Sequence, residues 1–297
     1  ACCGVMVPAI IYFAFNHANP LYHRGWAIPT ATDIAFSIGV VSLLGTRVPV
    51  AMKVLLTTLA VVDDLIAVII IAAVYTESLS FLFMGLAVVI FVLLMILNKR
   101  GIFHPIPYII LGLGLWYCIF RSGLHATLSG VILAMTIPYR AKYSTGRLIS
   151  PIMQWNNALI KWITFLILPL FGFVNAGVSF GDFTYSDLFH PVVLGVSLAL
   201  FLGKQIGVFA TVFVLVKTKL VDMPVHATWS HVYGIALCCG IGFTMSLFVD
   251  LLAFPAGHAQ EMAKVGIFMG SILSGVLGYL VLRFLTPDVS ALERKED

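Results

Sequence analysis

Two adjacent acidic residues, Asp63 and Asp64, lie inside an apolar run from Val54 to Tyr75 that is long enough to cross a bilayer. A carboxylate at the centre of a membrane costs about 2.5–3.5 kcal/mol on insertion scales. Two such groups in a row must therefore face protein, water or a cation. Because carboxylate oxygens are good ligands for hard cations such as Na⁺, the pair predicts an ion-transport site.

The helix geometry assigns different surroundings to the two carboxylates. Neighbouring residues of an α-helix point about 100° apart, so Asp63 and Asp64 face different directions. Lys204 lies deep in another apolar run and needs a buried partner. We therefore expect one Asp–Lys pair and one free carboxylate, which holds either a proton or Na⁺ but not both. Competition at a site that opens alternately to each side of the membrane gives cation/proton exchange.

The other ionisable residues inside apolar runs are Asp33, His125 and Asp250. Asp250 lies near the outer end of its run, which predicts a solvated edge. His125 stands near a helix start, where a lone histidine is more often a satisfied polar residue than a sensor. Residue type alone therefore assigns no function to His125.

The composition is that of an integral membrane protein. Of the 297 residues, 61% are hydrophobic and only 10% are charged, whereas ordinary soluble domains carry about 25% charged residues. The net charge of +4 without a basic cluster indicates no nucleic-acid partner. The cysteines have no metal-type spacing, so they are predicted to be small buried hydrophobic side chains rather than disulfides; they are Cys2, Cys3, Cys118, Cys238 and Cys239.

Apolar runs of about 20 residues predict membrane-spanning helices. The predicted spans are 1–15 (in part), 26–45, 53–75, 80–98, 104–119, 122–138, 156–178, 190–216, 229–253 and 260–286. The first run has no initiator methionine and no basic start, so it is predicted to be the second part of a span rather than a signal peptide. The expected fold class is an all-α polytopic membrane protein with one transmembrane transporter domain, residues 1–297.

Loop charges predict the orientation of these spans. Alternate loops and the tail carry twelve basic residues, which are Arg47, Lys53, Lys99, Arg100, Arg140, Lys142, Arg147, Lys217, Lys219, Arg283, Arg294 and Lys295. The loops on the other side carry two, Arg24 and Arg121. Positive charge stays in the cytoplasm, so the C-terminus is predicted to be cytoplasmic.

Two spans contain residues that interrupt helices. One has a proline, two threonines and Asp33 between Ala27 and Asp33, and the other has two glycines and two hydroxyl side chains between Cys238 and Ser246. Half-helix N-termini are positive and C-termini are negative. We therefore expect Asp33 to compensate facing N-termini and Lys204 to compensate facing C-termini near the middle of the bilayer.

Over nearly its whole length the chain resembles the NhaA-type sodium/proton antiporters. The likeness is carried by GWAIPTATDIAF at 25–36, VVDDL at 61–65, SGLHATL at 122–128, LPLF at 168–171, NAGV at 175–178 and CGIGFTMS at 239–246. The general link between broken helices and inverted repeats in transporters is based in part on this same family. The interpretation of the two interrupted spans as broken helices is therefore not independent of the resemblance. The resemblance implies an NhaA-like fold with inverted repeats and two crossed broken helices.

The resemblance also assigns residues. Asp64 matches the family's cation- and proton-carrying aspartate, and Asp63 matches its neighbour, which pairs with the lysine matched by Lys204. Thr32 and Asp33 match the crossing of the broken helices, so Asp64, Asp63 and Thr32 are the expected Na⁺ and proton site. The backbone of the second break is matched by Gly240, Gly242 and Thr244, and a histidine tied to pH response is matched by His125.

The implied activity is secondary-active export of Na⁺ or Li⁺ in exchange for protons across a bacterial inner membrane, with no cofactor beyond the transported ions. The resemblance further implies that the first two spans and part of the third are absent from this chain. Full-length members are expected to be homodimers, whereas a monomer and a dimer both remain alternatives for this chain, as do an active and an inactive form. The segment Asn156–Ile160 departs from the acid- and histidine-bearing segment of the best-known members, which predicts weaker or differently set pH sensing.

Other functions are weighed against the same residues. An intramembrane aspartyl protease needs two aspartates that converge from separate helices and share a proton, and Asp63 and Asp64 diverge on one helix. A zinc protease is excluded because His-Glu-x-x-His does not occur. No enzyme is therefore predicted. A cation channel and a proton-coupled transporter of another substrate, such as an organic anion, remain alternatives.

Overall fold

The computed structural model describes residues 1–75, 79–102, 104–139, 141–142, 148–177, 184–224 and 226–287. Within these residues the regular structure is helical except for one short antiparallel hairpin, β1 (Ala141–Lys142) with β2 (Leu148–Ile149). The chain forms two compact units, residues 1–67 with 171–297, and residues 68–170. The prediction that the whole chain acts as one transport domain stays a prediction.

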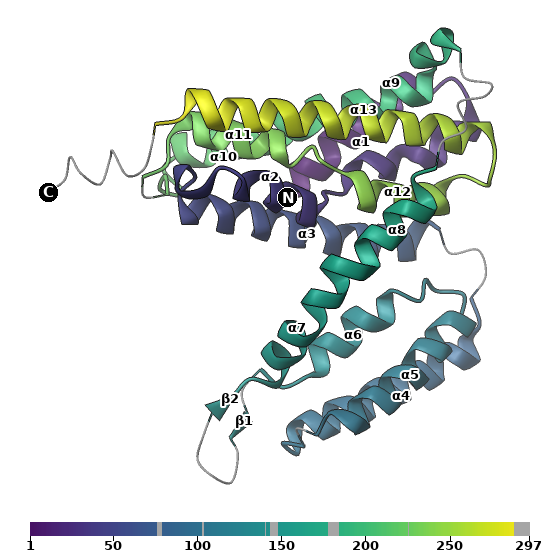
Figure 1. The fold of residues 1–297 in the computed structure, drawn as a ribbon. Helices are drawn as coiled ribbons and strands as arrows, with labels where there is room; N and C mark the ends of the chain where they lie inside the picture. Colours follow the sequence, from purple (N-terminus) through teal and green to yellow (C-terminus); the bar gives the residue numbers. More distant parts are fainter. Residues whose placement is uncertain are drawn as a thin grey trace, which may run out of the picture. The chain divides into compact units, whose positions relative to one another are not determined.

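The first unit contains all the residues predicted for the ion site. Its elements are α1 (Cys2–Asn16), η1 (Pro20–Thr30), α2 (Ile34–Ser42), η2 (Gly45–Arg47), most of α3 (Val50–Val74), the end of α8 (Leu168–Asn175), η4 (Tyr185–Phe189), α9 (Pro191–Leu198), η5 (Ala199–Gly203), α10 (Lys204–Lys217), α11 (Trp229–Cys238), α12 (Phe243–Ala253), α13 (His258–Leu280) and η6 (Val281–Leu285). Helix α13, yellow in Figure 1, packs against α9, α11 and α12, and α1 packs against α9 and α10.

Small residues allow α1 and α10 to approach closely. A Cβ atom added at Gly203 would lie 2.7 Å from the Cα atom of Pro8, and one added at Gly207 would lie 2.5 Å from the carbonyl oxygen of Cys3. This is the small-xxx-small spacing typical of helix packing in membranes. Immediately before Lys204, η5 is a π-helical segment, a local widening that is frequent at functional sites.

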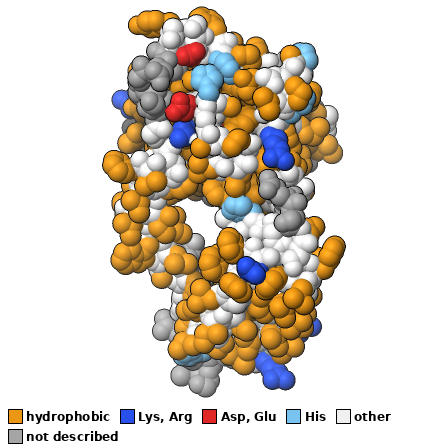
Figure 2. Space-filling view, turned by 90° about the vertical axis from the view of Figure 1, so that its right-hand side faces the viewer, with side chains coloured by type: hydrophobic (Ala, Val, Ile, Leu, Met, Phe, Trp, Pro, Cys, Tyr) orange, Lys and Arg blue, Asp and Glu red, His pale blue; other side chains and the backbone are white. Residues whose placement is uncertain are grey.

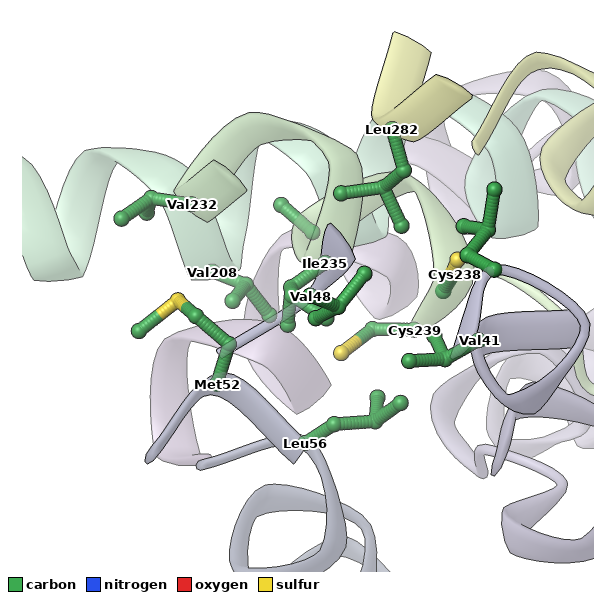
Figure 3. Close-up of a cluster of buried hydrophobic side chains, with 12 residues drawn as sticks. Val41, Val48, Met52, Leu56, Val208, Val232, Ile235, Cys238, Cys239 and Leu282 are labelled. Carbon is green, nitrogen blue, oxygen red and sulfur yellow. The ribbon is translucent and has the colours of Figure 1, made fainter. Parts of the chain in front are cut away.

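One cluster of buried apolar side chains joins α2, α3, α10, α11 and η6 in the first unit. Figure 3 shows side chains from α2, α3, α10, α11 and η6 in this cluster, including Met52, Leu56 and Ile235. The thiols of Cys238 and Cys239 are part of it, as predicted for small buried hydrophobic residues. The same prediction is wrong for Cys2 and Cys3, which are exposed free thiols near the chain start.

The second unit is built around a separate core. It contains α4 (Phe81–Lys99), α5 (Pro105–Arg121), α6 (Leu128–Thr136), the hairpin, α7 (Pro151–Trp162) and η3 (Ile163–Ile167). Leu94, Tyr108 and Leu115 are buried in its core, where α4 packs against α5 and α6. Proline at the first position starts α5 and α7, where the missing N–H costs no hydrogen bond.

Helices lie in each predicted apolar run, but in the runs 26–45 and 122–138 the α-helices, α2 and α6, have only nine residues each. Within the described residues, five helices have the length and hydropathy of a membrane span, and the bent pair α11–α12 makes a sixth. Helices α1 and α5 are shorter apolar helices of 10–17 residues. Hydrophobic side chains cover most of the face shown in Figure 2, and charged ones are few. The fold is therefore that of a polytopic all-α membrane protein.

Candidate ion-binding site at two crossed broken helices

Two helix breaks meet in the first unit. Between η1 and α2 the chain is not helical from Ala31 to Asp33, and between α11 and α12 it is not helical from Cys239 to Gly242. The axes of α11 and α12 are bent by 41° at this break. The backbone N–H of Asp33 donates to the carbonyl oxygen of Ile241 at 2.6 Å, so the two breaks are in direct contact.

Each broken helix satisfies carbonyl groups of the other. The hydroxyl of Ser37 in α2 donates to the carbonyl oxygen of Cys238, at the end of α11, at 2.9 Å. The hydroxyl of Ser246 in α12 donates to the carbonyl oxygen of Ile28, near the end of η1, at 2.8 Å. Carbonyls at a helix end have no partner within their own helix, and in lipid an unpaired one costs several kcal/mol. This reciprocal pairing therefore makes two interrupted spans compatible with a membrane.

Asp33 joins the N-termini of the two half-helices. Its Oδ1 accepts from the backbone N–H of Phe36 at 3.0 Å, which caps α2, and its Oδ2 accepts from the backbone N–H of Thr244 at 2.9 Å and from the Thr244 hydroxyl. The side chain is 1% exposed. A carboxylate shared by two helix N-termini is the arrangement that the helix dipole favours, and it matches the position expected for Asp33.

Asp63 and Lys204 form the buried ion pair expected from the sequence. The Lys204 Nζ lies 2.6 Å from Asp63 Oδ2, with exposed fractions of 0% and 2%. Lys204 also donates to the carbonyl oxygen of Thr30, the last residue of η1. The Thr32 hydroxyl lies 3.1 Å from Asp63 Oδ2 and 2.9 Å from the carbonyl oxygen of Cys239, and its single proton serves these two acceptors.

Asp64 differs from its neighbour in burial and, within the described residues, in forming no ion pair. It is only partly buried, and its Oδ1 is a buried atom without a hydrogen-bond partner within the described residues. Asp63 is engaged through Oδ2, and its Oδ1 is also without a partner there. The site therefore offers one committed carboxylate and, on the adjacent residue, one carboxylate that is available to a ligand.

No group of three or more His, Cys, Asp or Glu side chains converges as a metal site in the part of the chain that the structure describes. A transported Na⁺ at Asp64 must therefore complete its shell with hydroxyl, carbonyl or water oxygens. Hard cations accept all three. The expected ligands Asp64, Asp63 and Thr32 lie around one crossing, and their role in binding Na⁺ stays a prediction.

Neighbouring atoms lie so close to the backbone of the second break that Gly240 and Gly242 leave no room for a side chain. A Cβ atom at Gly240 would lie 2.6 Å from the carbonyl oxygen of Leu200, and one at Gly242 would lie 2.8 Å from the Cδ2 atom of Leu200. At Gly242 it would also meet the Ser246 hydroxyl, which holds the end of η1. The backbone role expected of Gly240 and Gly242 thus has a steric cause.

We expect Gly240→Ala to lower the free energy of unfolding by about 1–3 kcal/mol, since a methyl group there forces the backbone near Leu200 to move. The matched control is Gly39→Ala in α2, where an added Cβ meets nothing within 4 Å. There alanine is expected to be neutral or stabilising by up to about 1 kcal/mol. Thermal unfolding of the purified variants in detergent measures both effects. Equal midpoints for the two variants would contradict the steric explanation.

His125 lies in the second unit, in the turn between α5 and α6. Its Nδ1 is 2.8 Å from the hydroxyl of Thr127, and the ring is half-buried. This is the satisfied polar histidine that its position near a helix start predicts. Its part in a response to pH stays a prediction.

Two residues of the first unit, Ser37 and Ser271, were not predicted from the sequence, whereas Ser246 was already part of the predicted second break. Ser271 on α13 accepts from the backbone N–H groups of Gly242 and Phe243, both at 3.2 Å, and so caps α12 from a neighbouring helix. Ser37 bonds the carbonyl at the end of α11, as described above. Hydroxyl side chains recurring on apolar helices are the only signal that would have pointed to them.

The prediction of a solvated edge at Asp250 is wrong. Asp250 is fully buried in α12, with an exposed fraction of 0%. The position of Asp250 near the end of its apolar run suggested contact with water. In the structure, however, η1 packs against α12, the helix that carries Asp250.

Comparison of the sequence with known proteins matches the chain to one family. The sequence profile of the family described as Na⁺/H⁺ antiporter 1 matches residues 1–282. The chain belongs to this family. It is therefore a transporter rather than an enzyme.

Relatives within the Na⁺/H⁺ antiporter 1 family are close. The chain is 50% identical over 281 residues to "Na(+)/H(+) antiporter NhaA" of Nitrobacter hamburgensis, which covers 94% of this chain and 69% of that protein. It is 48% identical to the protein of the same name from Caulobacter vibrioides, with 99% and 71% covered. The match to the Brucella abortus protein, 47% identical, covers 97% of this chain but only 39% of the relative. Bacterial relatives and apolar helices identify a multi-pass bacterial membrane protein.

Proposed function

We propose that this chain is the transport core of a secondary-active antiporter that exports Na⁺ or Li⁺ in exchange for protons, with Asp64 as the carrier. The observation that supports Asp64 is the contrast with Asp63. Asp63 is neutralised by Lys204 at 2.6 Å, whereas Asp64 is only partly buried and forms no ion pair among the described residues. One oxygen of each carboxylate is without a hydrogen-bond partner there, so the ion pair and the burial distinguish the two residues. A carboxylate of this kind binds a proton or a hard cation, and each excludes the other.

In the proposed cycle, deprotonated Asp64 takes Na⁺ from the cytoplasm with help from oxygens near Thr32. The first unit then exposes the site to the outside, where a proton displaces the ion. The return step carries the proton inward, so the proton gradient drives Na⁺ export. Asp63 and Lys204 hold the crossing together, and Asp33 keeps the facing helix ends compensated. The excess of basic residues in alternate loops supports a cytoplasmic C-terminus.

Exchange is tested with the purified protein in liposomes that carry an imposed pH gradient and an internal pH dye. We expect Na⁺ or Li⁺ to dissipate the gradient and K⁺ to leave it unchanged at equal ionic strength. The same preparation is measured for ²²Na⁺ uptake with and without the gradient. Uptake of Na⁺ that ignores the pH gradient would indicate a channel and would overturn the proposal, as would equal responses to Na⁺ and K⁺.

A further inference from the structure

Asp250 is a buried acid whose carboxylate oxygens both lack a hydrogen-bond partner among the residues that the structure describes. It lies in α12, and both Oδ1 and Oδ2 are buried atoms without a hydrogen bond in the described part of the chain. The buried acids Asp33 and Asp63 contrast with it, since Asp33 accepts three hydrogen bonds and Asp63 pairs with Lys204. Buried polar groups are nearly always bonded, so Asp250 needs its own explanation.

The face of α12 that carries Asp250 looks toward η1. Ser246, one turn earlier on the same face, donates to the carbonyl oxygen of Ile28. Phe254, one turn later, lies so close to Gly25 that a Cβ atom there would come within 2.6 Å of its ring. Asp250 stands between these two contacts, so η1 closes over it. Its carboxyl is about 9 Å along α12 from Thr244, at a rise of 1.5 Å per residue.

Several charged and titratable groups on or beside the packed elements have contacts elsewhere, and Arg24 on η1 and Glu261 on α13 are further charged groups of these elements. On α13, Lys264 is the charged side chain whose field reaches Asp250, and its Nζ donates to the carbonyl oxygen of Gly177 at 3.2 Å. On the same helix the ring of His258 packs on that of His190. On η1, His23 is bonded to the carbonyl oxygen of His17. From α1, the Tyr12 hydroxyl donates to the carbonyl oxygen of Tyr22.

An ionised carboxylate in this environment would carry a desolvation cost that no hydrogen bond within the described residues offsets. Buried groups of this kind neutralise rather than remain charged, and the neutral form of Asp250 is the protonated acid. Ionisable residues inside a membrane protein are rare unless they serve transport. Asp250 is separate from the crossing, because Asp33, Asp63 and Lys204 bond one another or the helix ends and none of them bonds Asp250.

We propose that Asp250 is a second proton-binding site, in the half of α12 that leads away from the crossing. It holds a proton while η1 covers it, and it releases that proton to water when the contact between α12 and η1 opens. The positive charge of the Lys264 ammonium group then partly balances the negative charge of the Asp250 carboxylate. With the orientation proposed above, this site exchanges protons with the outer side, so the idea of its role in transport rests on the proposed antiport.

Infrared spectroscopy tests the proton without requiring transport. The carbonyl stretch of a protonated carboxyl group is recorded at pH 7 in H₂O and in D₂O for the wild type, Asp250→Asn and Asp222→Asn. Asp222 is exposed after α10 and serves as the matched control. We expect one deuterium-sensitive band to be lost in Asp250→Asn and kept in Asp222→Asn. An unchanged carboxyl region in Asp250→Asn means that Asp250 is ionised, and this overturns the proposal.

Liposomes with the outer face accessible test the coupling to transport. We expect Asp250→Asn, which copies the protonated form, to keep Na⁺-dependent exchange. The outside proton concentration for half-maximal exchange should change by at least about threefold, or about 0.5 pH unit. A pH profile that coincides with the wild type overturns the role in transport. Asp250→Ser is the second variant if the Asn variant does not fold. Loss of the infrared band without any wild-type exchange leaves the proton site standing and refutes the antiporter proposal instead.

Discussion

Asp64→Asn is expected to reduce Na⁺-driven proton movement in liposomes to the level of protein-free vesicles. The asparagine amide neither takes up a proton nor offers a negative charge to Na⁺, so both halves of the exchange are lost together. Because the buried Oδ1 of Asp64 has no hydrogen-bond partner among the described residues, folding should be little affected. We expect the free energy of unfolding to change by less than about 0.5 kcal/mol.

The matched control for this variant is again Asp222→Asn, which removes an exposed carboxylate. It should exchange Na⁺ for protons at the wild-type rate. If Asp64→Asn also exchanges normally, Asp64 is not the carrier. If the variant is inactive but unfolds several kcal/mol more easily, its inactivity reflects structure, and the assignment of the carrier falls with it.

Lys204→Met is expected to lower the free energy of unfolding by about 3–5 kcal/mol, the cost of leaving a buried charge without its partner. Asp63 is 2% exposed and cannot reach water in the folded state. The carbonyl oxygen of Thr30 loses its donor as well. Thermal or denaturant unfolding in detergent measures the change, and exchange should be lost because the crossing is no longer held.

The double variant Asp63→Asn with Lys204→Met separates charge from packing. It removes both charges, so it should recover most of the lost stability. Lys217→Met, at the exposed end of the same helix α10, should change stability by no more than about 0.5 kcal/mol. A double variant as unstable as Lys204→Met would show that the ammonium group serves Thr30 rather than Asp63.

The charged part of the site could be predicted because membranes penalise charge. Asp63, Asp64 and Lys204 each stand out in an apolar run, and the 100° step of the helix already separates the roles of the two aspartates. The breaks were visible for a similar reason, since proline, glycine and hydroxyl residues interrupt apolar runs only where other contacts satisfy the backbone. These inferences use local sequence and a strong physical cost.

The remaining features depend on partners distant in sequence. Ser37 looks like an ordinary small residue until the carbonyl group of Cys238 is placed beside it, 201 positions later in the chain. Asp250 was misjudged for the same reason, because its distance from a span end says nothing about which element lies over it. Cys2 and Cys3 were misjudged because an apolar segment does not reveal which of its faces is covered.

The reciprocal bonding of the two breaks has a consequence for synthesis in the cell. Asp33 and Thr244 are 211 residues apart, so at about 5–20 residues per second the ribosome takes roughly 10–40 s to deliver the second partner after the first. During that interval η1 and α2 have free carbonyl and N–H groups that lipid does not tolerate. We therefore expect the first broken span to stay in a hydrated environment, beside the insertion machinery or neighbouring helices, during this interval. Its insertion into lipid is complete only after α11 and α12 have been synthesised and pack against it.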